Sequence, residues 1–448
     1  MTITLDLPLT ISEIKSALRI STTLPDSFTV RKITTDSRKA DSSSLFIALD
    51  GKNISGNDFI ISAKDKGAVT LGTSLLADIT VSDSEAALLS LARYYKKKHL
   101  IKIRSTAAIT GSVGKTTTKE FLCKLLEGQH KIHATYGNYN NTIGVPLTIL
   151  SAPKDTEILI CELGMNSVGE IAKLSQCLEP DVAVITNIGT SHIGNLGSKE
   201  NIAKAKLEIL VGMSEKSVLL VPYGEKLLES KGKKSFSASS KKADTAILGS
   251  DNLEIFYKGK KIGTSFFNLR EYHYRECLAA ALCAAIHIQS DAAAIIGSIP
   301  KITVEQTRAR IYRVRNFYIL DDAYNASYES INAALEQLFS LSEYKKKSIL
   351  LGDVLELGEF SEEIHTKIGR LIARFSPERI YLYGKYAKYT SAGAVSMGFS
   401  RSDIYTFEIG DETKLAEKIK ELTHDGEIML AKGSRGMHLE RIIEYIKL

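Results

Sequence analysis

The sequence lacks the hallmarks of several classes of protein. No apolar run approaches the roughly 18 residues that a membrane-spanning helix requires. The segment MTITLDLPLT at the amino terminus has neither the basic region nor the apolar stretch of a secretion signal. The five cysteines show no C-x-x-C spacing, and several lie in apolar segments, where cysteine behaves as a small hydrophobic residue. We therefore expect a cytoplasmic protein in a reducing compartment, without a membrane span.

The charge pattern does not resemble that of a nucleic-acid-binding protein. The formal net charge is +6, and lysines cluster in runs at 96–98, 231–234 and 345–347. None of these runs alternates with aromatic residues as a nucleic-acid groove would, and such runs are most often solvated surface. The sequence also contains no short repeat and no low-complexity tract. We expect the positive excess to favour anionic substrates, and we expect no nucleic-acid partner.

The length and the hydrophobic pattern predict an α/β protein of three domains. A chain of 448 residues exceeds what one hydrophobic core usually serves. We place the domains at 1–83, 84–306 and 307–448, with a small mixed α/β domain first. In the second and third domains, continuous apolar runs alternate with amphipathic helical patterns, which is typical of a mainly parallel sheet covered on both faces. The predicted strands are 158–161, 182–186, 218–221, 318–320, 348–351, 379–383, 404–407 and 428–430.

Two further segments of the second domain have a clear pattern. The polar stretch 231–242 interrupts the alternation. The segment 253–264 is predicted to form a hairpin that turns around Lys258-Gly259-Lys260, and an alanine-rich helix is predicted over 275–288.

The segment STAAITGSVGKTTTKE, residues 105–120, is the most informative part of the chain. An apolar strand leads into Gly111-Ser112-Val113-Gly114-Lys115-Thr116-Thr117, and a helical pattern follows. Glycines allow backbone N–H groups to surround phosphate oxygens, and the following helix points its positive end at them. Lys115 supplies a positive charge, and the Thr116 hydroxyl can bind Mg²⁺. The full phosphate-loop pattern would have a glycine where this chain has Ile109, so the loop is a shortened variant. We nevertheless favour nucleotide binding over a glycine-rich turn that binds nothing.

Two polar side chains follow the next predicted strands. Glu162 ends the strand at 158–161, where a carboxylate beside a phosphate loop is placed to hold Mg²⁺ directly or through water, although a surface or capping acid would look the same. His192 lies just past the strand at 182–186. A lone histidine is usually structural, but this one is predicted at the same sheet edge as Glu162, which makes it a candidate metal ligand or substrate contact.

Lys206 falls inside the apolar stripe of a predicted helix over 198–210. A lysine that points inward must extend its head to water, pair with an acid or lose its charge, and the first of these is the commonest. In a metal site, a neutral amine can take up CO₂ and become a carbamate, which acts as an additional carboxylate. The spacing alone leaves these possibilities open.

Charged residues also follow strands of the third domain. Asp321-Asp322-Ala323-Tyr324-Asn325 follows one strand, and Lys432 and Arg435 follow another. Ligands of open α/β sheets lie at the carboxyl ends of the strands, so this domain is expected to contribute to a site. The acids are suited to a ribose or an amine, and Arg435 to a phosphate or carboxylate. Helix capping and a surface turn are the plainer interpretations.

Taken together, these segments resemble the Mur ligases, a family of ATP-dependent amide-forming enzymes of bacterial cell-wall synthesis. The resemblance covers nearly the whole chain and depends on the order of its motifs. They are TDSR (35–38), LFIAL (45–49), GNDFI (56–60), TGSVGKTTTKE (110–120), GNYNNTIGVPLT (137–148), ELGMNSVGEI (162–171), ITNIGTSHIGNLGS (185–198), AKAKLEI (203–209), DDAYNAS (321–327), LGDVLELGE (351–359) and KGSRGMHLE (432–440).

The resemblance implies a domain for a UDP-linked sugar, a central ATPase with a shortened glycine loop and a Rossmann-like domain that brings the amine. It implies ATP and Mg²⁺ as cofactors. The implied catalytic residues are Lys115, Glu162, His192 and Lys206, and the implied metal ligands are Thr116, Glu162, His192 and the carbamate of Lys206. It further implies ATP contacts from residues 111–117, Arg310 and Asn325. The implied substrate contacts are Asp36, Ser37, Arg38, Asn138, Asn141, Thr142, Asp322, Asp353, Lys432 and Arg435.

Within the family, the resemblance is greatest to members that join D-alanyl-D-alanine to UDP-N-acetylmuramoyl-tripeptide through an acyl phosphate, and we expect a monomer. Another Mur-type ligase, such as the one that adds the third residue, is the alternative. The Asp-Asn-Pro-Arg motif of one form of that enzyme is missing here. A folate polyglutamylating enzyme lacks the Asp-Ser-Arg domain, and a nucleotide-binding protein without turnover is the non-enzymatic alternative.

The chain departs from the family pattern at one place. Relatives usually carry His-Asn and a further Asn near the end of the central domain, where adenine is read. Here the segment is His273-Tyr274-Arg275-Glu276-Cys277. The resemblance therefore does not carry the family's adenine contacts over to this segment.

Overall fold

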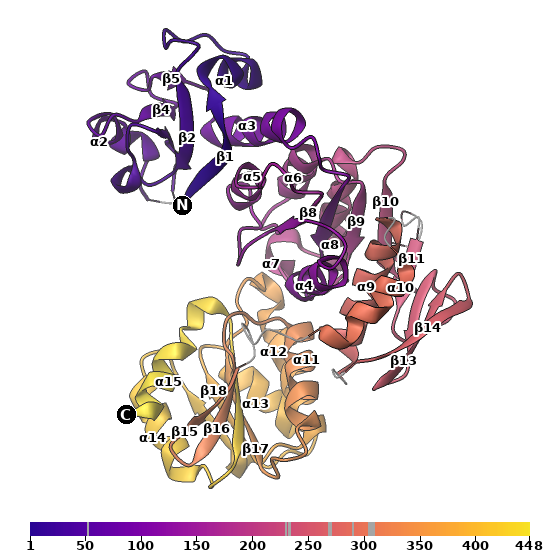
Figure 1. Ribbon diagram of the computed structural model, residues 1–448. Helices are drawn as coiled ribbons and strands as arrows, with labels where there is room; N and C mark the ends of the chain where they lie inside the picture. Colours follow the sequence, from indigo (N-terminus) through magenta and orange to yellow (C-terminus); the bar gives the residue numbers. More distant parts are fainter. Residues whose placement is uncertain (52, 229–230, 232–233, 268–270, 289–290, 303–309) are drawn as a thin grey trace.

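The computed structural model describes residues 1–51, 53–228, 231, 234–267, 271–288, 291–302 and 310–448, and these residues form three α/β domains (Figure 1). The N-terminal domain has a five-stranded sheet in the order β1-β2-β3-β4-β5, in which only β1 and β2 pair antiparallel. Its elements are β1 (Thr2–Thr10), α1 (Ile11–Leu18), β2 (Thr29–Thr34), η1 (Ser37–Lys39), β3 (Ser44–Ile47), η2 (Gly56–Phe59), α2 (Ile60–Lys64), β4 (Val69–Gly72) and β5 (Ile79–Thr80).

Helix α3 (Ser84–His99) joins the first two domains (Figure 1). Asp83 caps this helix by accepting hydrogen bonds from the backbone N–H groups of Glu85 and Ala86, as an N-cap carboxylate does. The helix packs against α1 on one side and against helices of the central domain on the other. We therefore retain 83/84 as the proposed boundary between the N-terminal and central domains.

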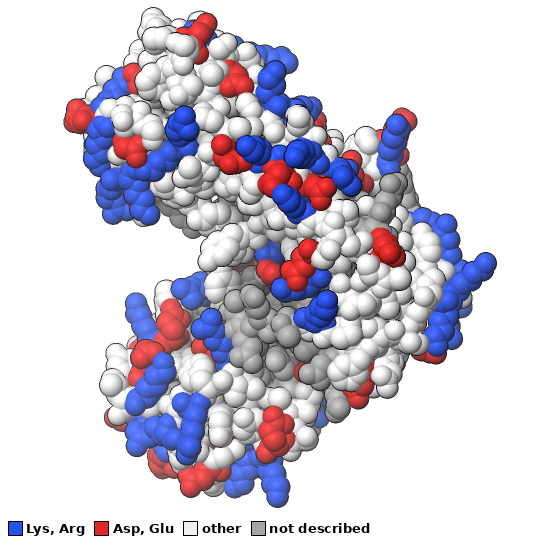
Figure 2. All heavy atoms as spheres, in the orientation of Figure 1, with Lys and Arg blue, Asp and Glu red and all other residues white. Residues whose placement is uncertain are grey.

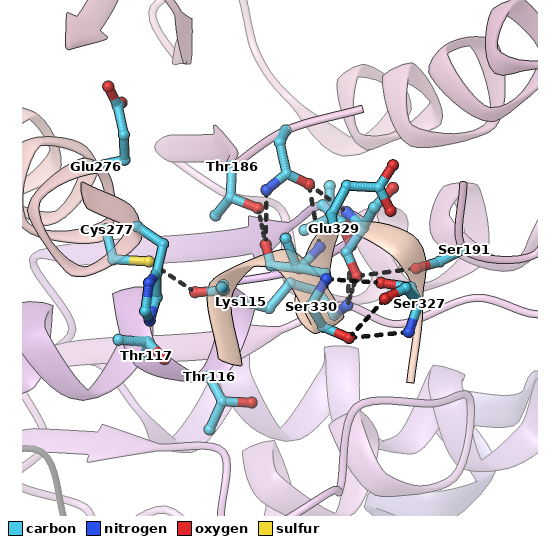
Figure 3. A pocket seen from close by; sticks show the side chains of 18 of the residues that line it. Lys115, Thr116, Thr117, Thr186, Ser191, Glu276, Cys277, Ser327, Glu329 and Ser330 are labelled. Atoms are coloured by element: carbon cyan, nitrogen blue, oxygen red, sulfur yellow. Dashed lines mark hydrogen bonds between the residues drawn. The ribbon is translucent and has the colours of Figure 1, made fainter. Parts of the chain in front are cut away.

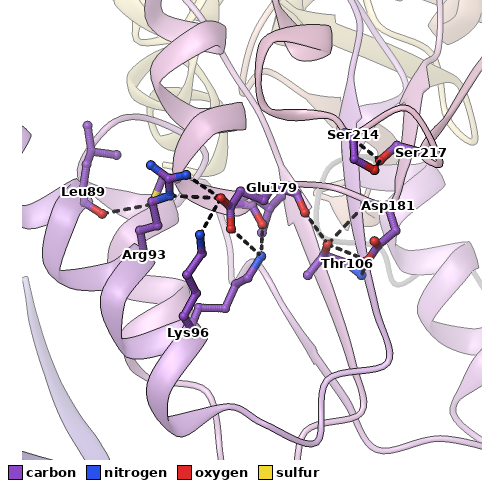
Figure 4. A network of polar contacts seen from close by, with 11 residues as sticks. Leu89, Arg93, Lys96, Thr106, Glu179, Asp181, Ser214 and Ser217 are labelled. Atoms are coloured by element: carbon purple, nitrogen blue, oxygen red, sulfur yellow. Dashed lines mark hydrogen bonds and ion pairs between the residues drawn. The ribbon is translucent and has the colours of Figure 1, made fainter. Parts of the chain in front are cut away.

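An ionic network holds the end of α3 to the central domain (Figure 4). Glu179 accepts a hydrogen bond from the guanidinium of Arg93 at 2.5 Å, and its carboxylate lies 2.8 Å from the Lys97 ammonium. Burial by itself would raise the pKa of Glu179, but the hydrogen bonds from Lys97 and Arg93 lower it below its usual value. This joint fixes the N-terminal domain relative to the edge of the central sheet.

The central domain has a nine-stranded sheet in the order β14-β13-β12-β11-β10-β9-β6-β8-β7, parallel except at the β12-β13-β14 end. Its elements are β6 (Ser105–Thr110), α4 (Lys115–Leu126), β7 (Ile132–Ala134), α5 (Gly144–Leu150), β8 (Ile158–Glu162), α6 (Glu170–Leu178), β9 (Val182–Ile185), α7 (Ile193–Leu196), α8 (Lys199–Leu207), η3 (Glu208–Gly212), β10 (Val218–Pro222), β11 (Lys234–Ser237), β12 (Thr245–Leu248), β13 (Asn252–Tyr257), β14 (Lys260–Phe266), α9 (Tyr272–His287), α10 (Ala292–Ser298) and η4 (Ile299–Lys301).

Helices cover both faces of this sheet, as the continuous apolar strands predict. Successive side chains of β6 alternate between two cores: Ile109 packs with α4 and α9, and Ala108 packs with α3, α5 and α6 on the other face. Because both faces are covered, polar residues are confined to the strand ends, and β6, β8 and β9 all deliver their carboxyl ends to one edge.

Two segments near the β14 end of the sheet had a sequence pattern. The polar stretch 231–242 contains a strand that was not predicted, β11 (Lys234–Ser237), which pairs parallel with β10 and β12; residues 232–233 lie outside the described part of the chain. Phe236 provides the buried side chain of that strand. The hairpin prediction is confirmed: β13 and β14 pair antiparallel, and both Lys258 and Gly259 have positive φ, at 49° and 75°, as a tight hairpin turn of this kind requires.

The C-terminal domain has a six-stranded sheet in the order β15-β16-β20-β17-β18-β19, with only β15 antiparallel. The boundary predicted at 306/307 lies outside the described residues. The elements are β15 (Arg310–Val314), β16 (Phe317–Asp322), α11 (Tyr328–Ser340), β17 (Lys347–Gly352), η5 (Gly358–Phe360), α12 (Ser361–Phe375), β18 (Arg379–Tyr383), α13 (Ala387–Val395), η6 (Arg401–Asp403), β19 (Ile404–Phe407), α14 (Glu412–Leu422), β20 (Ile428–Lys432), η7 (Arg435–Met437) and α15 (Leu439–Lys447).

The three domains are arranged around a hollow. The face shown in Figure 2 is hollowed between the N-terminal and C-terminal domains, with the central domain behind the hollow. Helix α7 of the central domain contacts η5 of the C-terminal domain. None of the helices in the described parts of the chain combines the length and the apolar character needed to cross a bilayer.

Candidate active site

A cavity of about 810 Å³ lies where the central and C-terminal domains meet. The carboxyl ends of β6, β8 and β9 contribute one wall, and the segment after β16 together with the start of α11 contributes another (Figure 3). Predicted site residues that line it are Gly111, Ser112, Val113, Gly114, Lys115, Thr116, Thr117, Asn138, Asn141, Glu162, His192, Lys206, Asp322, Asn325 and Lys432.

The glycine loop connects β6 to α4 and depends on its two glycines. Gly111 has φ of 146° and Gly114 has φ of 81°, conformations that side chains with a Cβ rarely adopt. Gly114 is also the N-cap of α4 and provides no side-chain hydrogen bond to the helix. The first-turn N–H groups of α4 are therefore not capped by this residue, which is the arrangement that suits an anion at a helix N-terminus.

A segment after β9 holds the glycine loop in shape. The Asn187 side-chain oxygen accepts hydrogen bonds from the backbone N–H groups of Ser112 and Val113, at 3.1 and 3.0 Å. The Thr186 hydroxyl donates to the Val113 carbonyl at 2.6 Å, and the Gly189 N–H donates to the Ser112 hydroxyl at 2.8 Å. Sequence reasoning missed the role of Asn187, because its partners lie about 75 residues away and no local spacing reveals them.

Glu162 is buried and bonded through both carboxylate oxygens. The Thr116 hydroxyl donates to one oxygen at 2.7 Å, and the Asn140 side-chain amide donates to the other at 2.9 Å. The carboxylate is only 1% exposed, so each hydrogen bond offsets part of its desolvation. The structure therefore brings together Thr116 and Glu162, as predicted, and adds Asn140, which the sequence prediction did not include.

Lys115 and His192 face charged or polar groups in the same cavity. The Lys115 ammonium donates to the Gly111 carbonyl at 2.8 Å. His192 Nδ1 lies 2.8 Å from a carboxylate oxygen of Glu356 in the C-terminal domain. Burial lowers the pKa of His192, and the Lys115 charge lowers it further, against the opposing effect of Glu356. His192 thus joins the two domains at the rim of the cavity.

Lys206 is a lysine whose side chain is almost completely buried in the site. Its side chain comes from α8 and is 2% exposed, so it does not extend its head to water. Burial holds the pKa of Lys206 well below its usual value, and the positive charge of Lys115 acts in the same direction. The amine is therefore disposed to be neutral, which is the form that reacts as a nucleophile.

The oxygen ligands near the glycine loop suit a small, hard cation. In the described part of the chain, no three His, Cys, Asp or Glu side chains are grouped to hold a metal by themselves. Mg²⁺ is usually bound through one or two carboxylates together with substrate phosphates and water, so the Thr116 hydroxyl and the Glu162 carboxylate fit it. The arrangement favours a cation that arrives with a nucleotide over a cation that the protein binds alone.

The predicted residues of the C-terminal domain divide into two groups. Asp322 and Lys432 stand opposite each other in the register of β16 and β20 and form an ion pair at the cavity. The Lys432 ammonium also donates to the Asn325 carbonyl at 3.0 Å. This group lies at the carboxyl ends of neighbouring strands, where the sheet was expected to present it.

The second group lies outside the cavity lining. Asp353 is 4% exposed inside the C-terminal domain, and burial raises its pKa to about 6. Arg435 lies 5.7 Å over the ring of Tyr324, which itself lines the cavity. Arg310 begins the edge strand β15 and is exposed.

The predicted sugar contacts of the N-terminal domain form their own cluster. The Arg38 guanidinium donates two hydrogen bonds to the Asp36 carboxylate, at 2.8 and 2.9 Å, and these lower the pKa of Asp36 to about 2. Asp36 also caps the short helix that starts at Ser37. These three residues do not line the cavity, and neither does Thr142 of the central domain.

The segment that departs from the family pattern lines the far wall of the cavity. Tyr272, His273, Tyr274, Glu276 and Cys277 all contribute to it. The Glu276 carboxylate accepts hydrogen bonds from the Tyr272 hydroxyl at 2.5 Å and from the Ala238 N–H at 2.9 Å. Burial raises the pKa of the Cys277 thiol to about 12, so this cysteine is a packing group and not a nucleophile.

Comparisons with known proteins agree with this architecture. The model of the "Mur ligase middle domain" matches residues 109–284, that of the "Mur ligase, glutamate ligase domain" matches 307–435, and that of the "Mur ligase family, catalytic domain" matches 29–111. The chain is similar to the UDP-N-acetylmuramoyl-tripeptide--D-alanyl-D-alanine ligase of Bacillus subtilis, with 35% identity over 93% of each chain. It is 32% identical to the ligase of that name from Rickettsia prowazekii, over 92% of this chain and 93% of that one.

Solved structures show the same arrangement of domains. A crystal structure of MurF from Acinetobacter baumannii superposes with a TM-score of 0.88 at 26% identity, and it covers 99% of this chain and 100% of that one. A structure of MurF ligase from Thermotoga maritima in complex with ADP gives a TM-score of 0.79 at 26% identity, over 93% and 96% of the two chains. The predicted α/β fold of three domains is thereby confirmed, and the chain belongs to the Mur ligase family.

Proposed function

We propose that this protein uses ATP to join D-alanyl-D-alanine to UDP-N-acetylmuramoyl-tripeptide, which gives the UDP-linked pentapeptide precursor of peptidoglycan. One observation carries the proposal: the glycine loop, the Thr116–Glu162 pair and the buried Lys206 share a single cavity with residues of the C-terminal domain. The relatives at 35% and 32% identity carry the name of this activity.

The ATP phosphates bind along residues 111–117. The uncapped first turn of α4 offers N–H groups and the positive end of the helix dipole to phosphate oxygens. Lys115 turns from the Gly111 carbonyl, where it rests at 2.8 Å, to the terminal phosphate. Asn325 and Arg310 are proposed to complete the ATP contacts from the C-terminal domain, and the ADP complex of the Thermotoga maritima protein supports a nucleotide in this fold.

Thr116 and Glu162 would hold Mg²⁺, and His192 and the carbamate of Lys206 would serve as further ligands. The cation offsets the repulsion between the terminal phosphate and the substrate carboxylate when it is bound. Formation of the carbamate requires the neutral amine, which burial of Lys206 favours. The lysine nitrogen bonds to the carbon of CO₂ and loses one proton to solvent, and the product carries a carboxylate-like negative charge.

The reaction then proceeds in two steps on the substrates. An oxygen of the tripeptide carboxylate attacks the γ-phosphorus, the bond to the ADP oxygen breaks, and an acyl phosphate forms. The amine of D-alanyl-D-alanine attacks the acyl carbon, loses its proton and expels inorganic phosphate, which retains the carboxylate oxygen. Lys115 stabilises the charge that develops on the transferring phosphoryl group, and the C-terminal domain keeps water from the acyl phosphate.

The remaining predicted residues are proposed to hold the two substrates. Asp36, Ser37 and Arg38 serve the uridine-linked sugar, since they form a polar cluster in the N-terminal domain. Asn138, Asn141 and Thr142 serve the peptide from the central domain. The contacts proposed from the C-terminal domain are Asp322, Asp353, Lys432 and Arg435.

We place this reaction in the cytoplasm, because ATP is plentiful there and because the five cysteines are free thiols. We also propose that the protein acts as a monomer, since two domains of one chain build the cavity.

Phosphate release tests the proposal directly. Purified protein with ATP, Mg²⁺, the UDP-linked tripeptide and D-alanyl-D-alanine is expected to release phosphate only when both substrates are present. Mass spectrometry is expected to find the product at the summed mass of the two substrates less one water. Lys115→Ala serves as the inactive reference. Release with a single amino acid in place of the dipeptide, or no release at all, would reject the assignment.

A further inference from the structure

The C-terminal domain contacts the segment that holds the glycine loop, and this contact has no place in the mechanism above. Glu329 lies in the first turn of α11 and lines the cavity (Figure 3). One oxygen of its carboxylate accepts from the Thr190 N–H at 2.9 Å, and the other accepts from the Thr190 hydroxyl at 2.9 Å. Both oxygens of the Glu329 carboxylate thus accept hydrogen bonds from Thr190 of the central domain.

The contact has a tight steric fit. A Cβ built on Gly189 would lie 2.7 Å from the Glu329 carboxylate carbon, closer than real Cβ contacts come. An alanine at residue 189 would therefore require the Glu329 carboxylate to move from its present position. The Gly189 backbone is not in the left-handed region, so its small size matters here and not its conformational freedom.

The contacted segment connects directly to the glycine loop. The Gly189 N–H donates to the Ser112 hydroxyl at 2.8 Å, and the Ser191 hydroxyl donates to the Ser112 carbonyl at 3.4 Å. A short path of hydrogen bonds therefore runs from Glu329 through residues 189–191 to Ser112. The position of the C-terminal domain is linked by this path to the loop expected to bind phosphate.

A second contact holds the same segment. The Gly194 N–H donates to the Glu356 carbonyl at 3.0 Å, and a Cβ on Gly194 would lie 2.4 Å from the Gly358 nitrogen. Two points of the C-terminal domain thus grip residues 189–194, one at the cavity and one beside it. Glu329→Ala removes the hydrogen bonds to Thr190 and leaves the backbone hydrogen bond between Gly194 and Glu356 in place.

We propose that Glu329 is a positioning residue that latches the C-terminal domain onto residues 189–191 and so keeps the cavity assembled around the glycine loop. The inference rests on the proposed function only for its effect on turnover. Without the latch, a larger fraction of molecules is open, with Asp322, Asn325 and Lys432 withdrawn from the cavity, so the active fraction falls. Hydrogen bonds to a charged group are stronger than neutral ones, which is why one side chain can shift this equilibrium measurably.

Small-angle X-ray scattering and steady-state kinetics on the full-length protein test the latch. Glu329→Ala is expected to increase the radius of gyration without ligand and to lower kcat about tenfold, which corresponds to about 1.4 kcal/mol. Glu329→Gln keeps the volume and one acceptor oxygen, and it is expected to show smaller changes in the same direction. The control is Glu363→Ala on α12, which removes a carboxylate that pairs with Lys367 one turn along. This variant is expected to match the wild type in both measurements.

Gly189→Ala provides an independent test from the other domain. Its Cβ would displace the Glu329 carboxylate, so this variant is expected to reproduce the effect of Glu329→Ala. Adding it to Glu329→Ala is expected to cause no further loss, because the two changes break one contact. Additive losses would overturn the proposal, and so would a Glu329→Ala protein whose radius of gyration and kcat equal those of the control.

The outcomes also separate this inference from the proposed function. The radius of gyration does not depend on which substrates the enzyme joins, so an open Glu329→Ala protein supports the latch even if the ligation assay fails. A wild-type enzyme that ligates the proposed substrates, together with a Glu329→Ala protein that stays closed and active, leaves the proposed function intact and rejects the latch. A melting temperature that falls without any change in kcat or radius of gyration would show a purely structural role.

Discussion

Replacing Gly111 with alanine tests whether the glycine loop is the phosphate site. The new Cβ would lie 1.8 Å from the Thr186 hydroxyl oxygen, which is bonded to the Val113 carbonyl at 2.6 Å. The φ of 146° at this position is also one that alanine rarely adopts. The loop is therefore expected to leave its present conformation, which ATP binding would have to restore.

The expected loss of ATP-binding free energy in Gly111→Ala has two contributions. Backbone strain of this kind costs about 1–3 kcal/mol. Loss of the Thr186 hydrogen bond costs about 0.5–1.5 kcal/mol. Together these give about 1.5–4.5 kcal/mol, which weakens ATP binding by about tenfold to a thousandfold.

Isothermal titration calorimetry with ATP and Mg²⁺ measures this change. Gly128→Ala is the matched control, because a Cβ at Gly128 meets no atom within 4 Å and that residue follows α4 at its far end from the loop. The control is expected to bind ATP as the wild type does. If Gly111→Ala binds within threefold of the wild type while circular dichroism shows an intact fold, the reasoning about this loop is refuted.

Three further predictions follow from the site and its surroundings. Asn187→Ala removes the acceptor for two loop N–H groups, so the KM for ATP is expected to rise about tenfold, at roughly 1 kcal/mol for each lost hydrogen bond with partial compensation by water. Lys206→Met keeps the length of the side chain but removes a buried amine. Steady-state kinetics are therefore expected to show no turnover, while the melting temperature stays equal to the wild-type value or rises. The smaller Lys206→Ala variant is expected to regain activity with added short carboxylic acids. Asp353→Asn is expected to remove a pH dependence of stability. The pKa of Asp353 is about 6 in the folded protein and 3.8 in the unfolded chain, so the wild type loses stability as the pH rises from about 4 to about 6. The loss relative to the variant is expected to reach about 3 kcal/mol.

Specific results would contradict each of these. An unchanged KM in Asn187→Ala would show that the loop holds its shape without that side chain. Full activity of Lys206→Ala without any added acid would reject the carbamate. Urea denaturation midpoints of wild type and Asp353→Asn that run parallel between pH 4 and pH 6 would show that the Asp353 carboxyl is not destabilised by burial.

The sequence predicted those parts of the fold whose signal is local. The predicted strands 379–383 and 404–407 match β18 and β19 residue for residue. Strand β18 is buried, and a buried parallel strand is apolar on both faces. The helical stripe around Lys206 placed that lysine inside the core, and the structure agrees. Strand β11 was missed because lysines and serines dominate its surroundings, and only Phe236 is a large buried side chain there.

Most of what sequence reasoning missed in the site consists of contacts between distant segments. Asn140, Asn187 and Glu329 reach partners 22, 75 and 139 residues away. Neither the spacing nor the periodicity of residues in the sequence indicates such a contact, since each contact depends on how two domains or two strand ends meet in space. Conversely, Asp353, Arg435, Arg310 and Thr142 were selected from motifs, and the cavity lining does not include them. Motifs identify residues that belong to a family's chemistry, whereas packing decides which of them face one another in a given arrangement of domains.

Transfer of an oxygen isotope tests the central claim most directly. The UDP-linked tripeptide is labelled with ¹⁸O in its terminal carboxylate and incubated with the enzyme, ATP, Mg²⁺ and D-alanyl-D-alanine, and the released phosphate is analysed by mass spectrometry. If the glycine loop delivers the γ-phosphoryl group to that carboxylate, each phosphate carries one ¹⁸O atom and ADP forms in equal amount. Unlabelled phosphate, or AMP and pyrophosphate as products, would contradict the account.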